Sequence, residues 1–205
     1  MTLPVFVHSY TLLHNRLFGL CRQLVQQCGG TGAESRDVGA SALGVIVLAD
    51  ASVEIAIHHR IEKGLPPREI APPLREIFRI TRESLLKRRA PLDRLKELAK
   101  ILNLTIAWDE EPWRSASDLH AIRNALAHYE SRPVISNHPD TDTFPGRARL
   151  LPIAQRIGTA DKLGAAGWLE LFLNQTCANW ACDTADRVLR ELDSSAWSLT
   201  LHFGG

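Results

Sequence analysis

Residues 115–130 have the sequence SASDLHAIRNALAHYE, and this stretch decides the fold that the sequence predicts. Its apolar side chains recur every three or four residues, which is typical of a helix with one buried face. They are Leu119, Ile122, Leu126 and Tyr129. We expect Ser115 or Ser117 to cap the start of the helix, and Pro133 to end it, because the residue before a proline avoids helical geometry. The stretch therefore predicts a helix of about four turns.

Three polar side chains of this helix gather away from its apolar face. At about 100° per residue, Asn124 and His128 lie one turn apart on the opposite face, and Arg123 lies on the shoulder between the two faces. Ala121 and Ala127 add little bulk nearby. Such a face can lie against another surface and leave a narrow polar cleft, so Arg123, Asn124 and His128 are the candidate catalytic residues.

The run Arg123-Asn124-Ala125-Leu126-Ala127-His128 resembles the motif of HEPN domains. Those domains carry an arginine, a polar neighbour and, about a turn later, a histidine on a late helix of a bundle. The resemblance implies an all-α fold, with an antiparallel helical bundle over residues 38–194 of a single domain that covers residues 1–205. Residues 1–30 are then an extra N-terminal helix, and residues 195–205 are a tail.

The resemblance also implies a function. Many HEPN proteins are dimeric, metal-independent endoribonucleases that act as toxins or in antiviral defence. The implied partners are RNA, a second copy of the chain, and an antitoxin or a defence-complex protein, with no metal and no cofactor. In one branch of the family a tyrosine two residues after the histidine is modified by a nucleotidyltransferase. Here Glu130 holds that position and Tyr129 precedes it, so the chain departs from that branch.

The motif side chains suit cleavage of RNA without a metal. The 2′-hydroxyl attacks the adjacent phosphorus and leaves a cyclic phosphate and a free 5′-hydroxyl, so the reaction needs proton transfer and stabilisation of negative charge. Histidine, with a reference pKa of about 6.5, transfers protons near neutral pH, and arginine grips phosphate oxygens in a planar fork. Two copies paired through these motif helices about a two-fold axis would bring both Arg123 and both His128 side chains to one composite site. Asn124 would then orient His128 or hold a phosphate oxygen.

A non-catalytic role explains the same residues. Arginine, asparagine and histidine on a helix also bind RNA or a nucleotide without cleaving it, and an apolar helix face also holds a protein partner. The alternative function is therefore an HEPN-like module for RNA or nucleotide binding or for protein interaction. Salt-sensitive binding of RNA without a cleavage product separates the binding module from a ribonuclease.

Residues 38–63 predict a helix that is apolar on nearly all sides, so we expect it at the centre of the bundle. Asp50, Glu54 and His58 nevertheless form a line along it at intervals of four residues. Charged groups on a buried helix are costly unless they are paired or reach water. Two interpretations follow. The line reaches solvent or forms local pairs, or Asp50 or Glu54 orients the arginine or the histidine of the motif.

Lys87, Arg88 and Arg89 form the strongest basic cluster of the chain, at the end of a predicted helix over residues 74–88. Positive charge at the C-terminus of a helix is favoured by the helix dipole, which is one interpretation of the cluster. Binding of RNA phosphates is the other. Further helices are predicted over residues 4–28, 92–102 and 169–192, with a polar loop over residues 131–146.

Composition and charge restrict the classes of function. The chain has 24 Lys and Arg residues against 23 Asp and Glu residues, a net charge of +1, which argues against a surface that binds nucleic acid everywhere but allows a local basic cleft. We expect no signal peptide, because the N-terminus lacks a charged start and a cleavage site. The most apolar run, residues 42–57, contains two acidic residues and is short for a bilayer. We therefore expect a cytoplasmic protein without a membrane segment and with its four cysteines reduced.

Overall fold

The computed structural model describes residues 6–29, 35–64, 90–101, 104–127, 147–162 and 168–194. Six α-helices and two 3₁₀ turns run through these residues, and none of these residues forms a β-strand. The helices are α1 (Phe6–Cys28), α2 (Ser35–Gly64), α4 (Pro91–Ile101), α5 (Trp113–Ala127), α6 (Arg147–Ile157) and α7 (Gln175–Asp193). The 3₁₀ turns are η1 (Ala160–Lys162) and η2 (Trp168–Leu171). The predicted all-α class is thereby confirmed.

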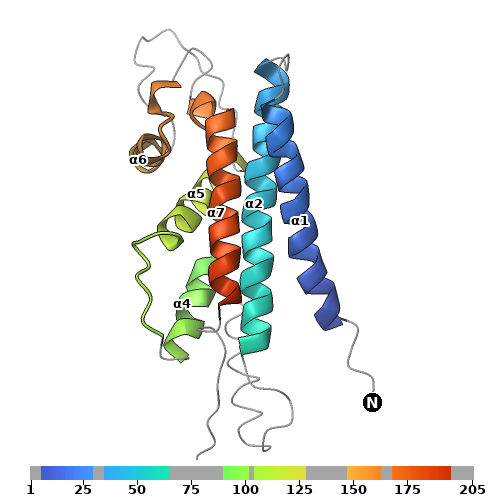
Figure 1. Cartoon of the computed structure of the whole chain (residues 1–205). Helices are drawn as coiled ribbons and strands as arrows, with labels where there is room; N and C mark the ends of the chain where they lie inside the picture. The colour runs from blue at the N-terminus through green and yellow to red at the C-terminus, as the bar shows by residue number, and fades with distance from the viewer. Residues whose placement is uncertain are drawn as a thin grey trace, which may run out of the picture.

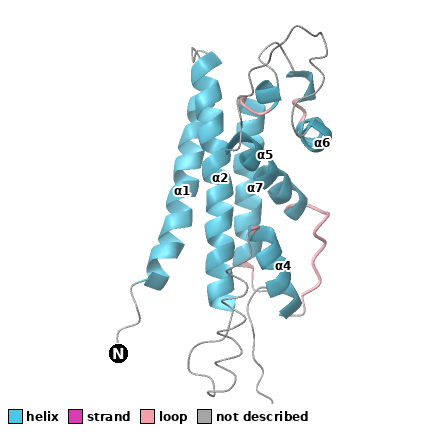
Figure 2. Cartoon of the chain, turned by 180° about the vertical axis from the view of Figure 1, so that it is seen from behind, coloured by secondary structure: helices cyan, strands magenta, loops and turns pink. Residues whose placement is uncertain are grey.

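Three long helices, α1, α2 and α7, lie side by side, and the shorter α4 and α5 lie along one flank of this group (Figure 1). The second helix, α2, packs against α1, α7, α4 and α5, so it is the central helix of the bundle, as its apolar composition predicts. The view from behind shows the same arrangement, with α6 on the outer side of α5 (Figure 2). Helices α4 and α5 therefore both pack against the central helix α2.

Every one of these helices contributes to one hydrophobic core. The largest fully buried side chains are Phe172, Ile46, Ile57, Ile61, Leu95, Leu98, Leu119, Ile122, Ile153, Leu171 and Val45. Helix α1 adds Phe18, Cys21 and Cys28, so the N-terminal helix shares this core with the rest of the bundle. The apolar face of the motif helix is buried where the sequence places it, at Leu119 and Ile122.

The last helix begins later than the sequence predicts. It starts at Gln175 rather than at residue 169, because the Asn174 side chain caps it by accepting a hydrogen bond of 3.0 Å from the backbone N–H of Cys177. The residues before this cap form η2 instead, and two of its apolar side chains are buried. This burial continues the apolar pattern of α7 into the turn, which is why the sequence reads as one longer helix.

Two further elements correct the sequence prediction. Helix α5 begins at Trp113, so both Ser115 and Ser117 lie inside the helix and neither caps it. Helix α6 is not predicted from the sequence. It contains Pro152, and a proline removes a backbone donor and usually interrupts a helix. The predicted helix over residues 74–88, the loop over 131–146 and the tail over 195–205 lie outside the described residues.

The apolar part of α2 is longer than the run that the sequence singles out. The segment Asp37–Ile61 is long and apolar enough to cross a membrane by length and composition alone. The run over residues 42–57 is the middle part of this longer segment. Half of the apolar window is buried inside the bundle, and the core helix of a soluble protein meets the same criterion.

The four cysteines are free thiols, and all are buried. A hydrogen bond between Cys21 of α1 and Cys182 of α7 lowers the pKa of the Cys182 thiol and raises that of Cys21, which burial raises further. Burial also raises the pKa of Cys28, and it raises that of Cys177 to about 12. Cys182 therefore carries the largest thiolate fraction of the four.

We expect iodoacetamide to alkylate Cys182 before Cys177 at about pH 8, because the thiolate is the reactive form. Cys177 and Cys182 lie in one tryptic peptide, residues 163–187, so fragmentation of this peptide by tandem mass spectrometry during the reaction gives the order of labelling. Replacing Cys182 by serine should abolish the early label on this peptide and leave the remaining three thiols slow to react. Faster labelling of Cys177 than of Cys182 would contradict the arrangement.

We expect Leu119→Ala to lower the free energy of unfolding by about 2–5 kcal/mol, because it removes a fully buried side chain of α5 and leaves a cavity in the core. Leu20→Ala is the matched control, since Leu20 is 49% exposed and its truncation should change stability by about 0.5 kcal/mol or less. Chemical denaturation of the two variants beside the wild type measures both effects. Equal losses in the two variants would show that α5 is not seated in the core as described.

Candidate functional site

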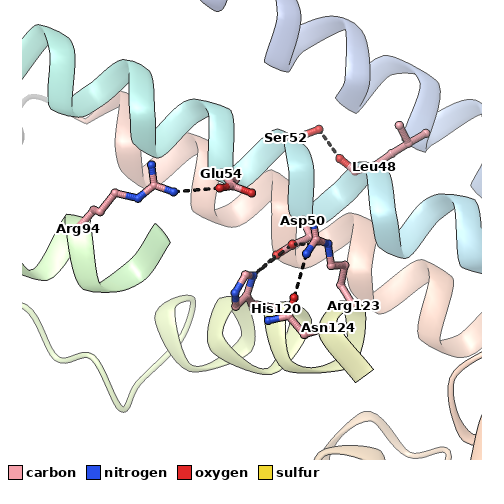
Figure 3. A network of polar contacts seen from close by, with 8 residues as sticks. All are labelled: Leu48, Asp50, Ser52, Glu54, Arg94, His120, Arg123 and Asn124. Atoms are coloured by element: carbon pink, nitrogen blue, oxygen red, sulfur yellow. Dashed lines mark hydrogen bonds and ion pairs between the residues drawn. The ribbon is translucent and has the colours of Figure 1, made fainter. Parts of the chain in front are cut away.

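A buried carboxylate lies where α2 and α5 pack together. Asp50 belongs to the central helix α2 and is only 3% exposed. A carboxylate inside a packed bundle is costly unless hydrogen-bond donors or positive charges surround it. Helix α5 supplies such groups, so Asp50 is the centre of a polar network between the two helices (Figure 3).

Two side chains of α5 point toward this carboxylate. His120 Nδ1 lies 3.2 Å from both carboxylate oxygens of Asp50, and Arg123 Nε lies 3.5 Å from Oδ2 of the same group. Arg123 Nη1 in turn donates a hydrogen bond of 2.9 Å to Oδ1 of Asn124 (Figure 3). An imidazole, a carboxylate, a guanidinium and an amide thus form one continuous network.

Spacing along α5 explains why these side chains meet. Residues three or four apart lie on the same side of a helix, so His120 lies one turn before both Arg123 and Asn124. The adjacent side of α5 carries Leu119 and Ile122, which are fully buried in the core. Packing of this apolar side fixes the rotation of α5 about its own axis. That rotation turns His120 and Arg123 toward α2.

The network is buried at its centre and partly exposed at its edge. The Asp50 side chain is 4% exposed, whereas those of His120 and Arg123 are 24% and 35% exposed. The carboxylate therefore lies behind two side chains that solvent reaches. An open groove of about 570 Å³ lies elsewhere, between Ile157 and the side of α7 that carries Trp180, and its lining includes none of the network residues.

The two acidic residues of α2 contact different helices. Asp50 contacts Arg123, as one of the two interpretations of the sequence predicts. Glu54 instead accepts a hydrogen bond of 2.9 Å from Nη2 of Arg94 on α4, whose side chain is 9% exposed (Figure 3). Within the described part of the chain, Asp50 is therefore the carboxylate that joins the candidate catalytic residues.

His120 is a network residue that the sequence motif does not include. The motif starts at Arg123, and the contact of His120 with Asp50 joins residues 70 positions apart in the sequence, which only tertiary packing brings together. The one signal in the sequence is spacing, because His120 precedes Arg123 by three residues and Asn124 by four. Those intervals place it on the same side of the helix.

The other predicted site residues, His128, Lys87, Arg88 and Arg89, lie outside the described residues, so their roles stay predictions. In the part of the chain that the structure describes, no group of three or more His, Cys, Asp and Glu side chains is arranged to hold a metal ion. Comparisons of the chain with protein families, with curated proteins and with solved structures find no match.

We expect Asp50→Asn to lower the free energy of unfolding by about 1–3 kcal/mol. The neutral amide no longer balances the positive charge of Arg123, and only its oxygen can accept a hydrogen bond. The matched control is Asp118→Asn, which disturbs the exposed pair between Asp118 of α5 and Arg156 of α6. That change should cost about 0.2–1 kcal/mol. Thermal and urea unfolding at neutral pH measure both variants, and a neutral Asp50→Asn would mean that the network does not stabilise the packing of α2 on α5.

Proposed function

We propose that this chain is a metal-independent endoribonuclease of HEPN type, which cuts RNA by attack of the 2′-hydroxyl on the adjacent phosphate. The observation that carries the proposal is the position of Arg123. Its Nε lies 3.5 Å from the buried Asp50 carboxylate, its Nη1 donates to Asn124, and its side chain is 35% exposed. A guanidinium that is held by a buried carboxylate and is partly exposed to solvent is suited to binding phosphate.

Arg123 binds the phosphate that is cut. A guanidinium has five N–H donors in a rigid fork, and its contacts with Asp50 and Asn124 use only part of this capacity. Because those contacts already restrict the side chain, it loses less conformational entropy when phosphate binds. Its positive charge stabilises the negative charge that builds on the phosphate oxygens in the transition state.

The remaining steps of the reaction are assigned from the sequence motif. His128 transfers a proton in the reaction, and Asn124 holds Arg123 and contributes its amide N–H groups to the phosphate. Lys87, Arg88 and Arg89 bind phosphates of the RNA outside the cut position. The chain acts in the cytoplasm on RNA, and its setting is a toxin–antitoxin or antiviral defence system.

Exposed apolar side chains on α1 and α2 support contact with a protein partner. Four large apolar side chains are exposed on these helices: Leu13, Leu20, Leu43 and Val47. An antitoxin or a defence-complex protein is the proposed partner of these side chains. Two copies of the chain pair through their motif helices and so form the composite site.

We expect Arg123→Ala to slow cleavage of a labelled single-stranded RNA by about 10²–10³-fold, because the charge on the transition-state phosphate loses its fixed donor. Denaturing gel electrophoresis of purified protein with RNA measures the rate, in the presence of EDTA. The products should carry a 2′,3′-cyclic phosphate and a 5′-hydroxyl, and DNA of the same sequence should stay intact because it lacks the attacking hydroxyl.

Arg156→Ala is the matched control for this variant. Arg156 also lies at the surface and pairs with an aspartate, yet its partner is Asp118 and not Asp50, so cleavage should stay within about twofold of the wild type. Cleavage by Arg123→Ala at the wild-type rate overturns the proposal. So does wild-type protein that binds RNA in a salt-sensitive way and forms no product, which is the behaviour of a non-catalytic binding module.

A further inference from the structure

We infer that His120, held by Asp50, is a second proton-transfer residue of this site and takes the proton from the attacking 2′-hydroxyl of RNA. The inference rests on the proposed ribonuclease function and adds a catalytic residue that lies outside the 123–128 motif. It comes from the contact of His120 Nδ1 with both oxygens of the buried Asp50 carboxylate, at 3.2 Å each.

The contact with Asp50 fixes which ring nitrogen of His120 is free to react. A carboxylate accepts hydrogen bonds, so Nδ1 carries the proton that faces Asp50, and Nε2 on the other side of the ring keeps its lone pair. The carboxylate also holds the ring in one orientation and stabilises the imidazolium that forms when Nε2 takes a proton. A histidine held in this way by a buried aspartate is positioned to act as a general base.

Exposure and position put this base next to the proposed phosphate site. The Asp50 side chain is 4% exposed and that of His120 is 24% exposed, so the base reaches solvent while its carboxylate partner does not. His120 lies about one helical turn from Arg123 and from Asn124, a rise of about 4.5–6 Å along α5. A phosphate bound to Arg123 therefore has its neighbouring 2′-hydroxyl within reach of the same face of α5.

The step balances without a cofactor or a metal. His120 Nε2 takes the proton of the 2′-hydroxyl while the 2′-oxygen forms a bond to phosphorus, and the bond between phosphorus and the 5′-oxygen breaks with its electron pair on that oxygen. The leaving oxygen takes a proton from the protonated imidazole of His128 in the proposed reaction. The products are a 2′,3′-cyclic phosphate and a 5′-hydroxyl, and exchange with water restores both histidines.

Assignment of the base to His120 changes what the second copy must supply. His120, Asp50, Arg123 and Asn124 belong to one chain and already contact one another in it. The phosphate-binding group and the base of one reaction therefore come from the same chain. Pairing of two copies is then needed for the acid or for RNA binding, and not for the base.

The test compares cleavage and RNA binding by His120→Ala, His120→Asn and His58→Ala with those of the wild type. Asparagine keeps a donor that can reach Asp50 but cannot take up a proton, so it separates proton transfer from positioning. His58 is a half-buried histidine of α2 outside the network, so His58→Ala is the control. Circular dichroism confirms that each variant is folded before its rate is measured.

We expect both His120 variants to cut RNA about 10²–10⁴-fold more slowly than the wild type and to bind RNA within about threefold of it. Free imidazole should restore part of the activity of His120→Ala, because the side chain that it replaces reaches solvent. His58→Ala should cut within about twofold of the wild type. Wild-type rates in His120→Ala or in His120→Asn overturn the inference while the ribonuclease proposal stands. A wild-type protein that cuts no RNA overturns both.

A second measurement does not depend on cleavage. Nitrogen-15 NMR of histidine-labelled protein at a pH where the ring is neutral reports which ring nitrogen of His120 carries the proton, with His120→Asn used to assign the signal. We expect the proton on Nδ1 in the wild type and a mixture of the two tautomers in Asp50→Asn. A proton on Nε2 in the wild type overturns the inference, because that nitrogen then cannot act as the base.

Discussion

The arrangement of this bundle depends on surrounding one buried carboxylate with donors. Asp50 lies on the helix that every long neighbour packs against, and it is 3% exposed. The rotation of α5 against α2 brings His120 and Arg123 to Asp50 and so partners the carboxylate. The same rotation buries Leu119 and Ile122. Polar and apolar requirements therefore agree on one orientation of α5, and this agreement places the candidate site.

Acidic side chains of the central helix α2 contact basic side chains on both flanking helices, α4 and α5. Asp50 contacts α5, and Glu54, one turn further along α2, accepts a hydrogen bond from Arg94 of α4. Arg94 is 7% exposed as a residue, so loss of its partner would leave a charge in the interior. Two acidic residues on one apolar helix thus connect it to both short helices, and only one of the two attachments includes the candidate catalytic residues.

Periodicity in the sequence predicts the all-α class, the central position of α2 and the buried face of α5, because each depends on intervals within a single helix. Other features depend on contacts between helices. The sequence leaves open whether Asp50 or Glu54 faces Arg123, and it does not reveal the contact of Asp50 with His120, because periodicity does not say which helix packs opposite. Helix α6 escapes prediction because Pro152 interrupts its local pattern, although Leu150 and Ile153 are buried.

The attachment of α6 has a consequence for how the molecule responds to ionic strength. Arg156 of α6 donates to Oδ2 of Asp118 on α5 from Nε at 3.1 Å and from Nη2 at 2.6 Å, and this pair is exposed to solvent. Dissolved ions screen exposed pairs over a Debye length of about 8 Å at physiological salt, whereas the shielded Asp50 carboxylate is screened much less. Concentrated salt therefore weakens this contact between α6 and α5, while the buried Leu150 and Ile153 still hold α6 in the core. Local opening of the outer side of α6 should then depend on salt concentration more strongly than opening of the helices around Asp50.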